Sequence, residues 1–81
     1  MKIQVLGMGC AKCFSMERNV REAVARLSLN AEIEKVSDLN QIISMGVMMT
    51  PAMAIDGKVV SSGKALSTDQ IINYIKERIG K

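Results

Sequence analysis

The sequence feature that most restricts the fold of this chain is the dipeptide Asp56-Gly57, which separates two short apolar segments. Asp-Gly favours a two-residue hairpin turn, because both positions of such a turn require positive φ angles. The flanking segments Ala52–Ile55 and Lys58–Ser61 therefore predict an antiparallel strand pair. Pro51 precedes the first of these strands, and the residue before a proline is pushed out of helical space, so the segment before Pro51 is predicted as a loop.

The first half of the chain predicts two more strands with a helix between them. Residues 2–6 alternate polar and apolar side chains and contain the β-branched Ile3 and Val5, which is typical of a strand. The segment 31–36 alternates less regularly and is also predicted as a strand. Between them, from Ala11 onward, one apolar stripe predicts a helix of about four turns. Its positions are Met16, Val20, Ala23, Val24 and Leu27.

Two further helices are predicted in the second half of the chain. Ser37 or Asp38 can cap a short helix that ends at Gly46. The apolar positions of that helix are Leu39, Ile42 and Ile43. The tetrapeptide 67–70, Ser-Thr-Asp-Gln, forms a capping box ahead of an amphipathic terminal helix, and Gly80 follows its end. The apolar positions of this last helix are Ile71, Ile72, Ile75 and Ile79.

The predicted element order is β-α-β-α-β-β-α, which indicates an α/β fold. Two strands joined through a helix are expected to be parallel with a right-handed crossover, and the hairpin completes a four-stranded mixed sheet flanked by helices on both faces. A chain of 81 residues supports one core, so we expect a single domain over residues 1–81. Because only 2% of the residues are aromatic, the seven methionines are expected to help fill that core.

Composition excludes several classes of function. The net charge of +3 comes from scattered residues, and without a basic cluster we expect no nucleic-acid partner. The N-terminal apolar stretch is too short for a secretory signal and no run of ~18 apolar residues occurs, so we expect a cytoplasmic monomer without a membrane partner. The sequence contains no histidine, which excludes imidazole catalysis. Any chemistry is therefore expected to use sulfur.

Four segments carry a resemblance to a known family: Lys2-Ile3-Gln4-Val5-Leu6-Gly7, Gly9-Cys10-Ala11-Lys12-Cys13, Thr50-Pro51-Ala52 and Val59-Val60-Ser61-Ser62-Gly63. In these four segments the chain resembles the small archaeal and bacterial thioredoxin-like proteins called redox-active disulfide proteins. The resemblance implies a thioredoxin-like fold and a dithiol/disulfide exchange site at Cys10 and Cys13. It also implies a cis Pro51 beside the dithiol, where Met49, Thr50 and Pro51 contact substrate and Thr50 presents its backbone polar groups to an extended peptide.

The spacing of the two cysteines suits this chemistry. Two cysteines three positions apart at a helix start place both sulfurs on one side of the first turn, where they can pair reversibly. Cys10 is at the helix N-terminus, where the macrodipole and the nearby cation of Lys12 stabilise a thiolate and lower its pKa toward neutrality. We therefore expect Cys10 to attack and Cys13 to resolve the mixed disulfide. No cofactor is expected besides the Cys10–Cys13 disulfide, and the expected partners are disulfide-containing proteins and an unidentified reductase.

The sequence departs from ordinary thioredoxins at several positions. Gly9 replaces the tryptophan that precedes their motif, and Ala11-Lys12 replaces the Gly-Pro between their cysteines. The first strand also lacks the buried carboxylate that helps to deprotonate their resolving thiol, so Gln4 or a water molecule is a candidate for that task. Because of these differences, the usual reductase partner cannot be assumed.

Other functions remain open at this point. The segment Met8 to Cys13 is similar to the metal-binding loop of heavy-metal-associated domains, which hold copper(I) between two thiolates. That family has the order β-α-β-β-α-β, which differs from the order predicted here. The cysteines can instead form a structural staple or be inert, or the domain can be a binding scaffold. Pro51 can be an ordinary proline at a strand start. Met8, Met48 and Met49 can line a groove near the dithiol or serve in packing.

Overall fold

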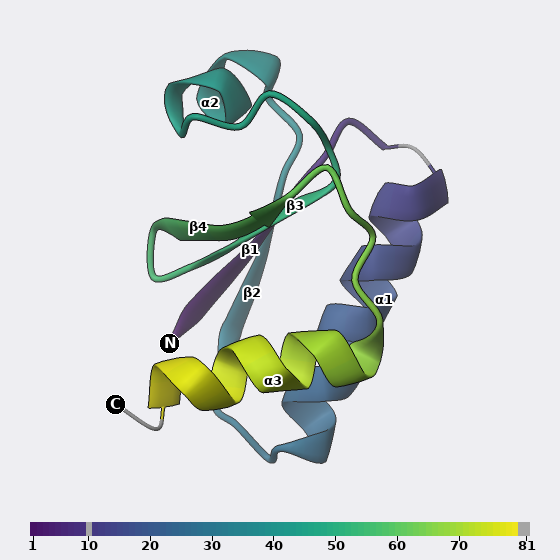
Figure 1. Cartoon of the computed structure of the whole chain (residues 1–81), viewed down its shortest axis with the longest axis vertical. Coiled ribbons are helices and arrows are strands. Elements are labelled where there is room, and N and C mark those ends of the chain that lie inside the picture. Colours follow the sequence, from purple (N-terminus) through teal and green to yellow (C-terminus); the bar gives the residue numbers. More distant parts are fainter. Residues whose placement is uncertain (10, 80–81) are drawn as a thin grey trace.

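The structure is a computed structural model that describes residues 1–9 and 11–79, and the chain follows the predicted order of elements (Figure 1). Cys10 lies outside the described residues, as does Gly80, which the sequence predicts after the last helix. The elements are β1 (Lys2–Leu6), α1 (Ala11–Arg26), β2 (Glu32–Val36), α2 (Leu39–Ser44), β3 (Ala52–Ile55), β4 (Lys58–Ser62) and α3 (Thr68–Ile79).

The four strands form one mixed sheet in the order β2-β1-β3-β4. β1 pairs in parallel with β2 and antiparallel with β3, so the expected topology is confirmed. Leu6, at the end of β1, is paired with Val36 at the end of β2 and with Ala52 at the start of β3. The loop after β1, the chain entering α2 and the chain entering β3 therefore all meet at the same end of the sheet. We call it the dithiol end.

The hairpin between β3 and β4 has the predicted two-residue turn. Asp56 and Gly57 have φ angles of 50° and 85°, and Ile55 is paired with Lys58 across the turn. Two consecutive positive φ angles match the right-handed twist of the flanking strands, which is why Asp-Gly is favoured there. The register shifts between Met53 and Ala54, so this hairpin contains one irregularity.

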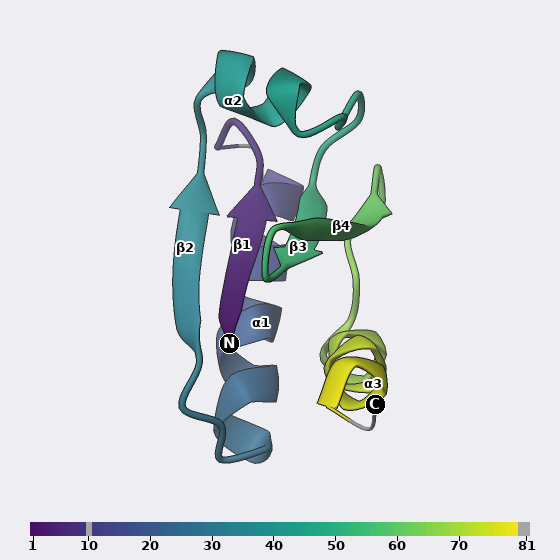
Figure 2. The same cartoon turned by 90° about the vertical axis from the view of Figure 1, so that its left-hand side faces the viewer.

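Helices flank both faces of the sheet, as predicted. α1 and α3 cover one face, while α2 lies across the dithiol end on the other (Figure 2). The larger core, between the sheet and the α1 and α3 helices, contains Ile3, Val5, Met16, Val20, Ala23, Met53, Ile55, Leu66, Ile71 and Ile75. The smaller core, under α2, contains Leu6, Val36, Ile42, Val47, Ala52 and Ala54. Each fully buried aliphatic side chain contributes about 1.5–3 kcal/mol of transfer free energy.

Side chains cap the two helices for which the sequence predicts caps. Asp38 precedes α2, and its carboxylate accepts hydrogen bonds from the backbone N–H groups of Asn40 and Gln41 at 2.9 and 3.4 Å. Before α3, the Gln70 N–H donates to Ser67 Oγ at 3.2 Å and the Ser67 N–H donates to Gln70 Oε1 at 3.0 Å. These reciprocal bonds are the predicted capping box. Among the described residues, no helix is long and apolar enough to cross a membrane.

A polar cluster lies on the part of the α2 face that α2 leaves uncovered. The Lys2 ammonium is 2.9 Å from Glu34 Oε2, and the Gln4 amide donates a hydrogen bond to Glu34 Oε1 at 3.0 Å. These two donors hold the pKa of the Glu34 carboxyl below its ordinary value near 4.5, and Lys2 has the larger effect. The same carboxylate raises the pKa of Lys2 above 10.5. Because folding lowers the pKa of this carboxyl, the free energy of unfolding decreases as the pH falls into the acid range.

Replacing Glu34 by Gln is expected to flatten the loss of stability in acid. A carboxyl whose pKa is lowered by folding stabilises the fold above its ordinary pKa, and that contribution is lost as the pH falls through the lowered value. Urea midpoints measured from pH 7 to pH 3 are therefore expected to fall more steeply for the parent chain than for Glu34→Gln. Glu77→Gln, on an exposed part of α3, is the control and should follow the parent curve. Parallel curves for the parent and Glu34→Gln would contradict this assignment.

Candidate active site at the dithiol end

Cys13 lies in the first turn of α1 and its side chain is 2% exposed. It packs against Gly7, the residue that follows β1. A Cβ placed on Gly7 would overlap Cys13 Sγ and would lie 2.9 Å from Cys13 Cβ. The absence of a side chain at residue 7 therefore lets the Cys13 sulfur approach the backbone of the loop between β1 and α1. The sequence contains a signal for this contact, a glycine directly after a strand and six residues before the cysteine, but no role was predicted for Gly7.

The other residues expected around the thiols are only partly described. Cys10, the expected attacking cysteine, lies outside the described residues. Lys12 is exposed in the first turn of α1, and that turn contains no acidic side chain. The helix N-terminus and this cation both favour negative charge on a neighbouring sulfur. Gln4 turns away from this region, because strand alternation places it on the face opposite α1, where its amide donates to Glu34.

The segment before β3 has the cis bond that the resemblance implies, between Thr50 and Pro51. Pro51 is buried, whereas Thr50 and Met49 are exposed. The N–H of Gly63 is bonded to the carbonyl oxygens of Met49 at 3.1 Å and of Pro51 at 3.0 Å. Gly63 has a φ of 74°, and a Cβ on it would lie 3.0 Å from Met49 Cβ. The chain after β4 thus holds Met49, Thr50 and Pro51 in place at the dithiol end.

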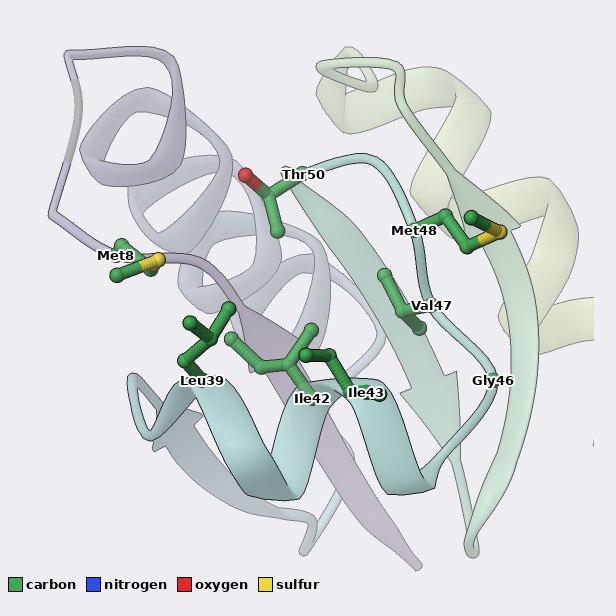
Figure 3. Close-up of a pocket in the computed structure, with 8 residues that line it drawn as sticks. All are labelled: Met8, Leu39, Ile42, Ile43, Gly46, Val47, Met48 and Thr50. Atoms are coloured by element: carbon green, nitrogen blue, oxygen red, sulfur yellow. The ribbon is translucent and has the colours of Figure 1, made fainter.

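An apolar groove of about 560 Å³ lies beside this segment (Figure 3). Leu39, Ile42 and Ile43 project from α2 into the space between Met8, in the loop after β1, and Thr50. The groove is also lined by Gly46, Val47 and Met48. None of the lining side chains is charged. The groove therefore suits an apolar group that approaches the dithiol end.

Two sets of apolar residues lie differently from the sequence-based interpretation. Within α2, Ile42 is buried, but Leu39 and Ile43 are 51% and 58% exposed and form the groove instead of the core. The expectation that methionines fill the core holds for Met16 and Met53, which are fully buried. It does not extend to Met8, Met48 and Met49, which are exposed at the dithiol end. Of these three, Met8 and Met48 line the groove, which is one of the two roles that the sequence left open for them. A six-residue helix buries one side only, so its i and i+4 residues can both face solvent.

A cation–π contact, for which no role was predicted, lies at the same end. Lys35, next to the end of β2, places its ammonium 4.2 Å from the centre of the Phe14 ring in the first turn of α1. Phe14 is 53% exposed. Such contacts contribute about 0.5–1 kcal/mol at exposed sites, so this pair orients an accessible ring and an accessible cation next to the cysteine motif.

Comparison with known proteins agrees with this fold. The thioredoxin domain family matches residues 1–76. A protein called thioredoxin from Methanothermobacter thermautotrophicus is 42% identical over 71 residues, which are 88% of this chain and 92% of that protein. A thioredoxin from Methanocaldococcus jannaschii is 40% identical over 74 residues, which are 91% of this chain and 85% of that protein. The chain belongs to the thioredoxin domain family, and the resemblance seen in the sequence is confirmed.

The topology also bears on the metal-carrier alternative. In heavy-metal-associated domains the second strand is followed directly by a third, whereas here α2 follows β2. The similarity of the Met8–Cys13 segment to that family is therefore limited to the loop.

Proposed function

We propose that this chain is a cytoplasmic thiol-disulfide oxidoreductase that reduces disulfide bonds in proteins. The observation that carries the proposal is the position of Cys13, buried in the first turn of the helix that follows the central strand of a thioredoxin-domain fold. Cys10 precedes Cys13 by three residues in the sequence. This arrangement suits a dithiol in which one sulfur meets the substrate and the other is held behind it.

The reaction has two exchange steps. The Cys10 thiolate attacks one sulfur of the substrate disulfide, the substrate S–S bond breaks, and the released thiolate takes up a proton. The Cys13 thiolate then attacks Cys10 Sγ in the mixed disulfide and releases the second substrate thiol. Two electrons pass from the dithiol to the substrate, and the chain is left with a Cys10–Cys13 disulfide. An external dithiol reductant returns it to the reduced form.

The surrounding residues have separate tasks in this proposal. Lys12 and the N-terminus of α1 stabilise the thiolate of Cys10 and so lower its pKa toward neutral pH. Met49, Thr50 and Pro51 contact the substrate segment, with the exposed Thr50 offering its backbone to an extended chain. Gly63 supports this contact through its bonds to Met49 and Pro51. No other cofactor is required.

The experiment that tests this function is a redox titration of the dithiol in dithiothreitol buffers, combined with a turnover assay on insulin disulfides. The expected result is a reversible two-electron transition below about −200 mV, with insulin reduction that depends on the chain. The titration is repeated with one equivalent of copper(I). If the thiols hold copper(I) tightly and the chain reduces no disulfide, a metal carrier on a thioredoxin scaffold replaces this proposal.

A further inference from the structure

The large exposed apolar side chains of this protein are concentrated at the dithiol end. Within the described residues, six of the eight exposed large apolar side chains lie there. They come from the loop after β1, the first turn of α1, α2 and the segment before β3. They are Met8, Phe14, Leu39, Ile43, Met48 and Met49. A monomer gains nothing in stability from exposing such a patch, which is typical of a surface that contacts a partner. We call these six residues the docking face.

Charge is distributed unevenly around the docking face. The segments that form the dithiol end, residues 7–15, 35–51 and 61–66, contain three lysines but one carboxylate. The lysines are Lys12, Lys35 and Lys64. The carboxylate belongs to Asp38 and is occupied as the cap of α2, where it accepts two backbone N–H groups. The N-terminus of α1 adds positive potential to the same end.

The remaining carboxylates with described partners lie elsewhere and are paired with cations. Glu34 binds Lys2 on the open part of the sheet, and Asp56, in the hairpin turn, lies 3.6 Å from Arg78 of α3. Glu22 binds Arg26 within α1 at 2.8 Å. At the docking face, by contrast, the Lys35 ammonium rests on the exposed Phe14 ring, which leaves its charge accessible. The lysines that border the apolar docking face, Lys12, Lys35 and Lys64, thus form no salt bridge with any side chain that the structure describes.

We infer that the docking face selects partner proteins whose exchanging disulfide is flanked by an apolar residue and by carboxylates. The apolar side chain enters the groove between α2 and Thr50, and the carboxylates approach Lys12 and Lys35. This inference rests on the proposed function, because it names the class of disulfide that the dithiol meets. Complementary charge raises the rate of encounter and orients the partner, while the groove supplies contact area.

The test compares two synthetic peptides that share one disulfide and one leucine but carry either glutamates or lysines beside them. The prereduced chain is mixed with each peptide, and the second-order rate constant of reduction is measured at low and high ionic strength. At low salt the glutamate peptide is expected to react about tenfold faster than the lysine peptide. The ratio is expected to approach one at high salt, because salt screens exposed charges.

Matched variants assign the effect to the docking face. The double variant Lys12→Gln/Lys35→Gln is expected to bring the ratio near one, whereas Lys58→Gln/Lys76→Gln removes the same charge at β4 and α3 and should retain it. Using the ratio cancels any change in thiol reactivity. A third peptide carries alanine in place of the leucine. Ile43→Ser is expected to lower the rate constant for the leucine peptide severalfold and to change that for the alanine peptide much less. Ile43 is half exposed, so this change leaves the core intact.

Any of the following outcomes would overturn the inference. Equal rates for the two peptides, or a ratio that the Lys12/Lys35 variant leaves unchanged, would show that the charges do not select the partner. A chain that reduces neutral hydroxyethyl disulfide but distinguishes none of the peptides would remain an oxidoreductase without this selectivity. A chain that reduces neither peptide nor hydroxyethyl disulfide would fail the proposed function, and the inference would fall with it.

Discussion

Replacing Cys10 by Ser is expected to reduce disulfide turnover to the uncatalysed background. A hydroxyl at neutral pH is a far weaker nucleophile than a thiolate, and loss of a covalent nucleophile costs on the order of 10⁴-fold or more in other enzymes. Because serine differs from cysteine only by an oxygen in place of the sulfur, the fold of Cys10→Ser is expected to persist. The measurement is insulin reduction with dithiothreitol as donor, alongside a urea unfolding curve.

Cys13→Ser is the matched variant, and it should fail at a different step. Cys10 still attacks the substrate, but no second thiolate releases it, so a covalent complex accumulates. Mass spectrometry of Cys13→Ser mixed with a disulfide protein is expected to show this mixed disulfide, and Cys10→Ser is expected to show none. If Cys10→Ser forms the complex and Cys13→Ser does not, the assigned roles of the two cysteines are reversed. If neither change affects turnover, the dithiol is not the active group.

Replacing Gly7 by Ala is expected to lower the free energy of unfolding and to slow the resolving step. The new Cβ would overlap Cys13 Sγ, so the first turn of α1 or the loop after β1 must move. Overpacking of this kind costs about 1–3 kcal/mol. Since the displaced group is the resolving sulfur itself, the mixed disulfide is expected to decay more slowly than in the parent chain. Urea unfolding gives the first effect, and the decay of a trapped mixed disulfide gives the second.

Gly57→Ala separates the two effects of the Gly7 change. Gly57 has a φ of 85°, and beyond its chain neighbours no heavy atom lies within 4 Å of the place that a Cβ would take, so its replacement strains the backbone without a clash. The cost is about 1–2 kcal/mol, comparable with that expected for Gly7→Ala. Gly57 is in the hairpin turn, far along the sheet from Cys13, so the mixed disulfide of Gly57→Ala should decay at the parent rate. Equal decay in both glycine variants would show that Gly7 acts only on stability.

Much of the fold follows from local sequence patterns, because the signals that define its elements are short in range. The Asp56-Gly57 turn, the capping box at Ser67 and Gln70, and the stripe along α1 each depend on residues a few positions apart. Alternation of polar and apolar residues in β1 also decided which side chains face α1. These patterns are local, so reasoning from the sequence recovers them along with the order of the strands and helices.

The candidate site was only partly predictable. The cysteine motif and the segment Thr50-Pro51 are visible in the sequence, and the cis bond follows from the family resemblance. Leu39 and Ile43 were expected to be apolar positions of an ordinary helix, and nothing nearby in the sequence indicated that they line a groove with Met8. Neither the contact of Gly7 with Cys13 nor that of Lys35 with Phe14 was predicted.

The sequence by itself determined the elements, their order, the family and the pair of sulfurs, because each depends on residue type and on spacing within a few turns. Only the tertiary structure decided which surfaces meet. Gly63 supports Met49 and Pro51, and Lys35 reaches Phe14, across separations of 12 to 21 residues that no local pattern encodes. The reason is the sheet order β2-β1-β3-β4, which brings the loop after β1, α2 and Pro51 to the same end of the sheet. Packing there leaves six apolar side chains exposed around the dithiol end.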